Sequence, residues 1–487
     1  MSERRPRRGL VAESSRFALS QYLSRAMLLA RGLVAAAALG PAGFGAWNAL
    51  VLILDYGSYA SLGALYGLDL ELPPAVVSGD ASRATRAMRG AWGLALAGGA
   101  AFAVAVVAYL AAGTWLAVTG WGWGPPLLML AAVFVQLTFH YHASVLRARG
   151  DFAAVSAAVT LQASIGGVVG LLAVWRAGVW GLLWGWLIGG IAALVRLARS
   201  PDRPPLEPAS PASGLPLARA GFPLFAYFAL SLVLRSLDRI ALVRFGGNES
   251  LGRYSIGLIA AGLVLYPPEA LATVLFPRLA AAAEGARDPA RTRDELVRAQ
   301  RALALLLPPA VALGAFWAGP IITVLLPRFT PGVPALRILA LGALLLAMAT
   351  LPGYALLGLK RGMRMLPWAA GAVLVAGLLV FSVAAVSPRA SHVAMAAAAG
   401  QGCFALVVLV LGARELASGS GRSALVAGSL LPSLWAAALA ALALVFGGDG
   451  VAAAAWRSLA LALGYAPLLL ALGRGLGLRD LLRAWRG

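Results

Sequence analysis

The segment MLPWAAGAVLVAGLLVFSVAAV, residues 365–386, has no charged side chain and is long enough to cross a lipid bilayer as one helix. A helix rises about 1.5 Å per residue, so about 20 apolar residues span the ~30 Å hydrocarbon core. Segments of this kind recur along the whole chain, separated by short polar or Pro/Gly-containing breaks. We therefore predict an all-α, polytopic membrane protein.

The hydrophobic segments predict about fourteen transmembrane helices. An even number places both ends of the chain on the same side of the membrane. The predicted spans are residues 17–39, 43–66, 90–112, 124–146, 152–174, 178–198, 220–243, 251–276, 302–326, 333–357, 365–386, 391–412, 424–446 and 452–473.

Composition supports this class and argues against others. Hydrophobic residues make up 61% of the 487 residues, charged residues only 12%, and the mean hydropathy is +0.83. A soluble core of this length could not bury so much apolar surface. The net charge of +21 does not indicate nucleic acid, because the basic residues lie between apolar segments without interleaved aromatic side chains. With Cys403 as its one cysteine, the chain can form neither an intrachain disulfide nor a cysteine metal cluster, and we expect no metal and no cofactor.

Basic residues are concentrated in every second loop. Lys and Arg of short loops are retained on the cytoplasmic side, so the alternation predicts that both termini are cytoplasmic. The segment 278–301 is the longest of these loops, and it is compatible with an amphipathic helix along the membrane surface or with a solvated connector. The basic residues are Arg4, Arg5, Arg7, Arg8, Arg83, Arg86, Arg89, Arg147, Arg149, Arg196, Arg199, Arg203, Arg219, those of 278–301, Lys360, Arg361, Arg364, Arg414, Arg422, Arg474, Arg479, Arg483 and Arg486.

An internal repeat predicts two similar bundles. The turn LGPAGFGAW (39–47) after the first span has a counterpart, FGGNESLGRY (245–254), after the seventh. Two six-helix lobes of the same topology imply a parallel repeat around a central cavity. The Pro-rich stretch SPDRPPLEPASPASGLP is predicted to link them. The predicted domains are an N-lobe (1–199), a cytoplasmic linker (200–216), a C-lobe (217–413) and two additional helices with a cytoplasmic tail (414–487).

Arginines inside the spans are the main candidates for substrate binding. An ionisable group at the centre of a span costs about 2.5–3.5 kcal/mol on insertion scales, so its presence needs a reason. Arg25 and Arg31 lie deep in the first span, with Gln21 and Ser24 nearby. A guanidinium pairs bidentately with phosphate and stays charged when desolvated. We therefore predict that these four residues bind an anionic substrate in the central cavity.

The seventh span carries a second charged patch. Arg235, Asp238 and Arg239 follow i, i+3, i+4 spacing on one helix face. We predict that the two arginines contribute to substrate binding. The alternative is internal neutralisation, in which Asp238 pairs with Arg239 or Arg31 and Asp55 pairs with an arginine of the first span.

Other polar residues inside the spans leave several roles open. Asp55, Asp238 and Glu269 are candidates for proton or sodium coupling, or for charge pairing alone. His140 and His142 face different sides of a straight helix, which argues against a shared metal site. Gln136, Tyr141 and Gln162 are candidates for hydrogen bonds to sugar hydroxyls.

Four segments, through their order and spacing, resemble a known family. They are LGPAGFGAWNALVLILDYGSYASLGALYG (39–67), SGDASRATRAMRGA (78–91), LRARGDF (146–152) and LRSLDRIALVRFGGNESLGRYS (234–255). Over most of residues 15–415 the chain resembles the Wzx-like polysaccharide and oligosaccharide-lipid flippases of the multidrug/oligosaccharidyl-lipid/polysaccharide exporter superfamily. It departs from them in its bias toward Arg and in having fourteen predicted spans where many relatives have twelve.

The resemblance implies a flippase of the bacterial cytoplasmic (inner) membrane. Its substrate would be an undecaprenyl-diphosphate-linked saccharide, moved by alternating access for cell-surface polysaccharide biosynthesis. A polysaccharide polymerase or glycosyltransferases are the implied protein partners. A lipid II flippase and a cation-coupled multidrug exporter of the same superfamily remain alternatives. We expect no enzyme, because the external loops are short and almost free of Asp and Glu, and no catalytic motif is present in the sequence.

Overall fold

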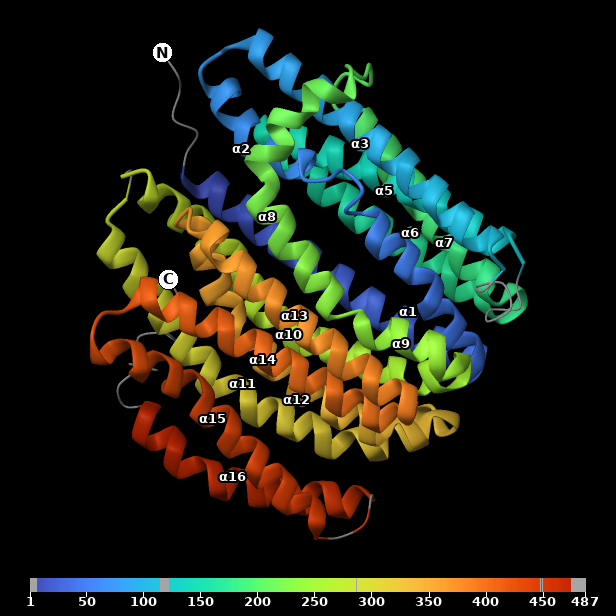
Figure 1. Ribbon diagram of the computed structural model, residues 1–487, viewed down its shortest axis with the longest axis vertical. Helices are drawn as coiled ribbons and strands as arrows, with labels where there is room; N and C mark the ends of the chain where they lie inside the picture. Colours follow the sequence, from blue (N-terminus) through green and yellow to red (C-terminus); the bar gives the residue numbers. More distant parts are fainter. Residues whose placement is uncertain (1–6, 114–121, 286, 447, 449, 474–487) are drawn as a thin grey trace. The chain divides into compact units, whose positions relative to one another are not determined.

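The computed structural model describes residues 7–113, 122–285, 287–446, 448 and 450–473, and the side chains of residues 7–26 and 28 lie outside the described part. Within that part the regular structure is helical, without strands, which confirms the all-α prediction (Figure 1). The elements are α1 (Arg7–Gly57), α2 (Ala64–Val77), α3 (Ala81–Ala111), α5 (Gly124–Ala148), α6 (Phe152–Ala177), α7 (Val179–Ala198), η1 (Pro211–Gly214), α8 (Leu215–Leu234), α9 (Leu237–Phe245), α10 (Gly247–Ala283), α11 (Pro289–Leu325), η2 (Pro327–Gly332), α12 (Val333–Gly358), α13 (Gly362–Val386), α14 (Ala390–Leu416), α15 (Ser420–Val445) and α16 (Val451–Gly473).

The described residues contain thirteen helices that are long and apolar enough to cross a membrane, one fewer than predicted. The difference arises at α1, which contains the first and second predicted spans on either side of a break. At Gly40 the backbone has φ 65° and ψ 179°, and Pro41 follows. Glycine adopts this left-handed φ without steric cost, and proline lacks the N–H that a continuing helix would use. Both arms of α1 are therefore counted as one helix.

Two of the predicted spans are broken helices. The second was expected over 43–66, but α1 ends at Gly57, and α2 begins at Ala64 after a turn. The seventh, expected over 220–243, is divided into α8 and α9 at Arg235 and Ser236. Hydrophobicity sets the length of a span but does not reveal such interruptions, because a few Ser, Gly or Arg residues within a long apolar segment leave its mean hydropathy high.

The segment 278–301 is a helical hairpin rather than a separate surface helix. It consists of the last turns of α10 and the first turns of α11, joined by a short turn. The Asp288 carboxylate accepts a hydrogen bond from the Ala290 backbone N–H at 2.9 Å, and Pro289 occupies the first helical position. This combination of an N-cap acid and a following proline starts α11 well before the membrane.

The chain forms two compact units, residues 1–232 and 233–487, and each is described by itself. The domain limits predicted from the sequence, at 199, 216 and 413, stay a prediction.

Unit 1 is built around the glycine-rich interface of α6 and α7. A Cβ placed on Gly185 would lie 2.7 Å from the Gly166 carbonyl oxygen and from the Gly170 nitrogen. A Cβ on Gly189 would lie 2.6 Å from the Gln162 carbonyl oxygen. Small residues allow helix backbones to approach closely where lipid supplies no hydrophobic driving force. The two helices therefore touch through their backbones.

The Pro-rich stretch is packed against unit 1. We call residues 200–214 the strap. Tyr141 of α5 donates a hydrogen bond to the Pro205 carbonyl at 2.8 Å, and Trp92 of α3 donates one to the Leu206 carbonyl at 3.0 Å. The Trp92 and Tyr141 rings stack with centroids 4.8 Å apart. The strap thus has defined contacts with two spanning helices.

Helix α8 continues this attachment. A Cβ on Gly67 would lie 1.9 Å from the Leu217 carbonyl oxygen, and one on Gly221 would lie 2.3 Å from the Gly63 carbonyl oxygen. The helix therefore packs directly on α2 and the turn before it. Most of α8 belongs to unit 1 for this reason.

In unit 2, α12 packs between α10 and α14, and α15 and α16 pack on α11. An apolar cluster that includes Phe316, Ala443 and Leu461 joins the last two helices to α11. Polar contacts add to it: Gln300 donates to the Ser429 hydroxyl at 3.0 Å, and the Tyr465 hydroxyl donates to the Leu305 carbonyl at 2.9 Å. The C-terminal pair is thus fixed to unit 2 by both kinds of contact.

A buried arginine closes the end of α15. Arg457 of α16 is 2% exposed, and its Nε donates to the Ala443 carbonyl at 3.1 Å. The last carbonyls of a helix have no partner within the helix. Arg457→Leu is expected to lower the free energy of unfolding by about 1–3 kcal/mol, because a buried acceptor loses its donor. Thermal unfolding in detergent measures this, with Leu459→Ala at an exposed position of α16 as control; equal stability of Arg457→Leu and wild type would contradict it.

Candidate functional site

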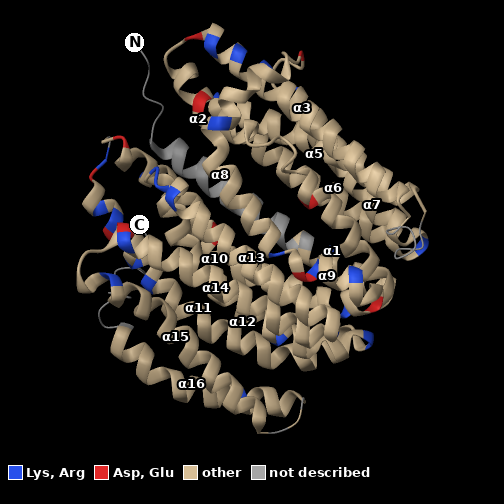
Figure 2. Ribbon diagram, viewed as in Figure 1, with Lys and Arg blue, Asp and Glu red and all other residues tan. Residues whose placement is uncertain are grey.

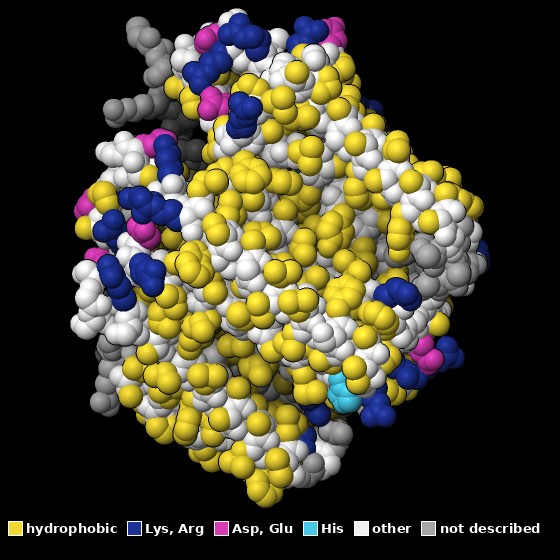
Figure 3. Space-filling view, viewed as in Figure 1, with side chains coloured by type: hydrophobic (Ala, Val, Ile, Leu, Met, Phe, Trp, Pro, Cys, Tyr) yellow, Lys and Arg dark blue, Asp and Glu magenta, His cyan; other side chains and the backbone are white. Residues whose placement is uncertain are grey.

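Charged side chains gather at the ends of helices and leave long uncharged segments between them (Figure 2). On the face seen in Figure 3, hydrophobic side chains predominate within each unit away from its charged residues. This surface is suited to lipid contact, and the few charged groups inside the spans stand out against it.

Arg31 is the predicted binding residue that the structure defines best in unit 1. It is half-buried in the N-terminal arm of α1. Its guanidinium carbon lies over the Trp186 ring of α7, 5.2 Å from the ring centroid. A Cβ on Gly170 of α6 would lie 3.7 Å from the Arg31 Cδ, so that glycine leaves room for the side chain. Among the described residues no ion pair joins Arg31 to a carboxylate, and the aromatic face of Trp186 is its charge-stabilising neighbour.

The other predicted residues of the first span are Gln21, Ser24 and Arg25. Their backbone lies in α1, but their side chains lie outside the described residues. Their role in substrate binding stays a prediction.

Three polar side chains of unit 1 form a hydrogen-bonded chain inside the predicted spans. The side-chain amide of Gln162 in α6 donates to the side-chain Oε1 of Gln136 at 3.1 Å, and the side-chain Nε2 of Gln136 lies 3.0 Å from His140 Nε2. All three are half-buried. The structure thus brings together both glutamines that were candidates for sugar contacts, and adds His140 to them.

The neighbouring aromatic residue has a different role. Tyr141 is fully buried, and its hydroxyl is used by the Pro205 carbonyl of the strap. His142 is also buried, and its Nδ1 lies 2.9 Å from the Thr138 carbonyl oxygen in the preceding helical turn. Both side chains serve internal packing, and the suggestion that Tyr141 contacts sugar is not supported.

In unit 2 the predicted residues lie next to partners of opposite charge or to hydrogen-bond donors. Arg235 Nη1 lies 3.6 Å from Glu269 Oε1, with both side chains partly exposed. Asp238 is fully buried and accepts a hydrogen bond from the Tyr254 hydroxyl. Arg239 is 9% exposed, and its backbone N–H donates to the Asp238 carboxylate at 2.7 Å. Two of the candidate carboxylates, Asp238 and Glu269, are therefore engaged within unit 2.

Asp55, the third candidate carboxylate, is half-buried near the end of α1. No group of three or more His, Cys, Asp or Glu side chains among the described residues could hold a metal ion. Sequence reasoning missed Trp186 and Tyr254, because neither an isolated tryptophan in an apolar helix nor a tyrosine beside a turn signals a partner on another helix.

Comparison with known proteins identifies similar sequences and folds. A family model described as "Polysaccharide biosynthesis protein" matches residues 39–328. No curated protein sequence matches the chain.

Among solved structures, the lipid II flippase MurJ in an inward closed conformation aligns with a TM-score of 0.68 at 13% identity, covering 96% of this chain and 99% of that one. An inward-facing multidrug resistance MATE family transporter of the MOP superfamily aligns with a TM-score of 0.66 at 17% identity, covering 82% and 95%. An outward-facing transporter of the same kind aligns at 0.59 and 16%, covering 85% and 96%. At these identities the likeness shows the fold, which is that of MOP-superfamily transporters.

Proposed function

Because the chain belongs to the polysaccharide biosynthesis protein family, we propose that it is a flippase for a polyprenyl-diphosphate-linked oligosaccharide in the bacterial cytoplasmic membrane. The headgroup crosses by alternating access, while the polyprenyl tail stays in lipid. Both termini are cytoplasmic, as the alternation of basic loops predicts. The product would supply cell-surface polysaccharide biosynthesis, with a polymerase or glycosyltransferases as partners.

The observation that carries this proposal is the state of Arg31. A charge in the interior of a span is costly, and most such charges are paired. Arg31 lies over Trp186, and no ion pair joins it to a carboxylate among the described residues, which supports a role for its guanidinium in binding an anionic ligand. A diphosphate suits it, because the planar guanidinium can pair with two phosphate oxygens at once.

The remaining predicted residues are given roles around Arg31. Gln21, Ser24 and Arg25 precede it on the same helix and extend the phosphate site. The half-buried chain of Gln136, His140 and Gln162 offers amide and imidazole groups to saccharide hydroxyls.

Unit 2 contributes charge pairs and further arginines. Asp238 and Glu269 are proposed to serve charge pairing rather than ion coupling, since Tyr254 and Arg235 engage them. Arg235 and Arg239 are proposed to contribute to substrate binding. Asp55 is proposed to serve in charge pairing or in proton or sodium coupling.

Lipid II transport is the second candidate. The lipid II flippase MurJ aligns over 96% of this chain, so the shared fold includes α15 and α16, whereas the inward-facing MATE transporter covers 82%. Lipid II is also a polyprenyl diphosphate, so its phosphates could pair with Arg31 equally well. A multidrug exporter is a third candidate on fold alone, and a cationic substrate would gain nothing from Arg31.

Ligand selectivity tests the proposal. The purified chain is expected to bind undecaprenyl diphosphate in preference to undecaprenol and to a cationic drug, measured by native mass spectrometry or by displacement of a fluorescent lipid. A preference for the drug would move the protein to the exporter branch. Equal binding of undecaprenol and undecaprenyl diphosphate would mean that the protein does not recognise the phosphate groups. Competition between a lipid-linked oligosaccharide and lipid II then separates the first two candidates.

A further inference from the structure

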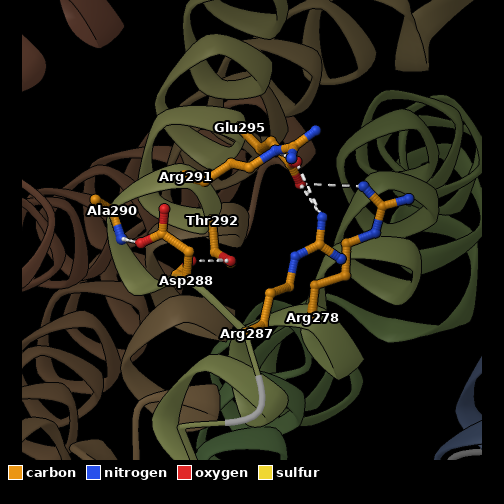
Figure 4. Close-up of polar contacts among 7 residues, drawn as sticks. All are labelled: Arg278, Arg287, Asp288, Ala290, Arg291, Thr292 and Glu295. Carbon is orange, nitrogen blue, oxygen red and sulfur yellow. Dashed lines mark hydrogen bonds and ion pairs between the residues drawn. The ribbon is translucent and has the colours of Figure 1, made fainter.

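Four charged residues of unit 2 form a cluster with more cations than one internal carboxylate can neutralise (Figure 4). Arg278 Nη1 lies 3.1 Å from Glu295 Oε2, Arg287 Nη2 lies 3.1 Å from Glu295 Oε1, and Arg291 Nε lies 3.7 Å from Oε1. We call Arg278, Arg287, Arg291 and Glu295 the arginine cluster. Its net charge is +2.

Hydrogen-bonding capacity is also unequal in the cluster. Three guanidinium groups offer about fifteen N–H donors, while one carboxylate accepts about four hydrogen bonds. Glu295 is only 18% exposed, whereas Arg278, Arg287 and Arg291 are 43%, 34% and 75% exposed. The carboxylate therefore holds the guanidinium groups together from within, and their other donors face outward.

Nearby acids do not complete the neutralisation. The Asp288 carboxylate accepts from the Ala290 backbone N–H and serves as the N-cap of α11. Glu284, at the tip of the hairpin, lies 3.3 Å from Lys360 Nζ. Over residues 278–301 as a whole, six Arg stand against four Asp and Glu. The hairpin remains cationic when every acid is counted.

The predicted spans place the cluster at the height of lipid headgroups. Arg278 follows the predicted span 251–276 by two residues, and Glu295 precedes the predicted span 302–326 by seven. At about 1.5 Å per residue these positions are about 3 and 10 Å beyond the hydrocarbon core. The headgroup layer is about 5–8 Å thick on each side of the core. The arginine side chains therefore reach the phosphates of the adjacent leaflet.

We propose that the arginine cluster is a binding site for the phosphate of an anionic phospholipid headgroup, on the side of the membrane that the charge pattern predicts to be cytoplasmic. The phosphate oxygens accept hydrogen bonds from the guanidinium N–H groups of Arg278, Arg287 and Arg291 that Glu295 does not use. Glu295 keeps the three side chains in one place and so reduces the entropy lost on binding. This site is separate from that proposed around Arg31, and it requires no transported substrate.

Lipid binding to the full chain tests this proposal. The probe is phosphatidylglycerol added to protein in a zwitterionic phosphatidylcholine background, with bound lipid counted by native mass spectrometry. Arg287→Gln/Arg291→Gln is expected to weaken binding about 30-fold, since each variant position loses a hydrogen bond to the phosphate worth about 1 kcal/mol. Arg293→Gln/Arg298→Gln is the matched control. It removes the same charge from exposed positions of α11, where no ion pair is found among the described residues, and it is expected to weaken binding less than about threefold.

Three results would overturn the proposal. Equal losses in the two double variants would mean diffuse attraction by surface charge, and no loss in either would mean that the cluster serves stability alone. Complete displacement of the lipid by inorganic phosphate would make free phosphate the ligand. If the double variant does not fold, Arg291→Gln alone is used, because Arg291 is the most exposed of the three and makes the longest contact with Glu295. It is expected to lower phosphatidylglycerol binding about fivefold through the loss of one hydrogen bond to the phosphate, and unchanged binding would overturn the proposal.

Discussion

Arg31→Ala is expected to bind undecaprenyl diphosphate about 100-fold more weakly than the unmodified chain. Hydrogen bonds to charged groups contribute about 1.5–3 kcal/mol each, and a bidentate guanidinium–phosphate contact contains two of them. Even the lower value, counted twice, gives about 3 kcal/mol, or about 100-fold. Titration of the purified variant with the lipid measures the loss.

Two further variants separate a phosphate contact from a general effect of charge. Arg31→Lys keeps the charge but loses the planar pair of donors, so its affinity should fall between wild type and Arg31→Ala. Arg176→Ala removes an arginine from the exposed end of α6 and should leave the affinity unchanged. Wild-type affinity in Arg31→Ala, with normal folding, would refute the phosphate site at this position.

Gly185→Leu is expected to lower the stability of the protein by forcing two packed helices apart. A Cβ at this position would lie 2.7 Å from backbone atoms of Gly166 and Gly170, which cannot move aside as a flexible side chain can. Helices α6 and α7 must separate to admit it. Overpacking of this kind costs about 1–3 kcal/mol, and sometimes more. Fluorescence-detected size-exclusion chromatography after heating should show earlier loss of the monodisperse peak.

Gly371→Leu provides the control for this substitution. Gly371 is also inside a predicted span, in α13, but a Cβ there meets nothing within 4 Å. Both variants make the same change of residue, so a difference between them reports packing rather than helix propensity. Equal thermal stability of the two variants would mean that α6 and α7 tolerate separation.

The spans could be predicted because the sequence carries two independent signals for them. Apolar length marks each helix, and the alternation of basic loops checks the number. The sequence alone did not decide the structure of residues 278–301. These residues are charged on several faces, which suits a helix in water as well as one on a membrane surface. The choice is made by Asp288 and Pro289, which start a new helix directly after a short turn.

The candidate site was predicted only in part. Arg31, Arg235 and Asp238 could be selected because charge inside a span is rare. Their partners could not, since Arg31 meets Trp186 across α1 and α7, and Asp238 meets Tyr254 across α9 and α10. Contacts between helices depend on helix rotation, which the hydrophobic pattern of a nearly uniformly apolar helix leaves undetermined.

The contacts of the strap also could not be predicted from the sequence. Its proline content suggests a loose linker, and nothing in its composition indicates that Trp92 and Tyr141 hold Pro205 and Leu206. These partners lie far away in the sequence and come from helices that look like ordinary spans.

Because Trp92 and Tyr141 bind the strap and α8 follows it directly, little of the chain that joins the two units lacks both contacts and regular structure. Fifteen residues of flexible linker would have a root-mean-square end-to-end distance of about 20 Å. Here the chain stays attached to unit 1 through most of α8, and the backbone leaves regular helix only at Arg235 and Ser236 before α9 begins. Only these two residues separate α8 from α9, so the irregular chain between the two helices can extend over at most about 7 Å.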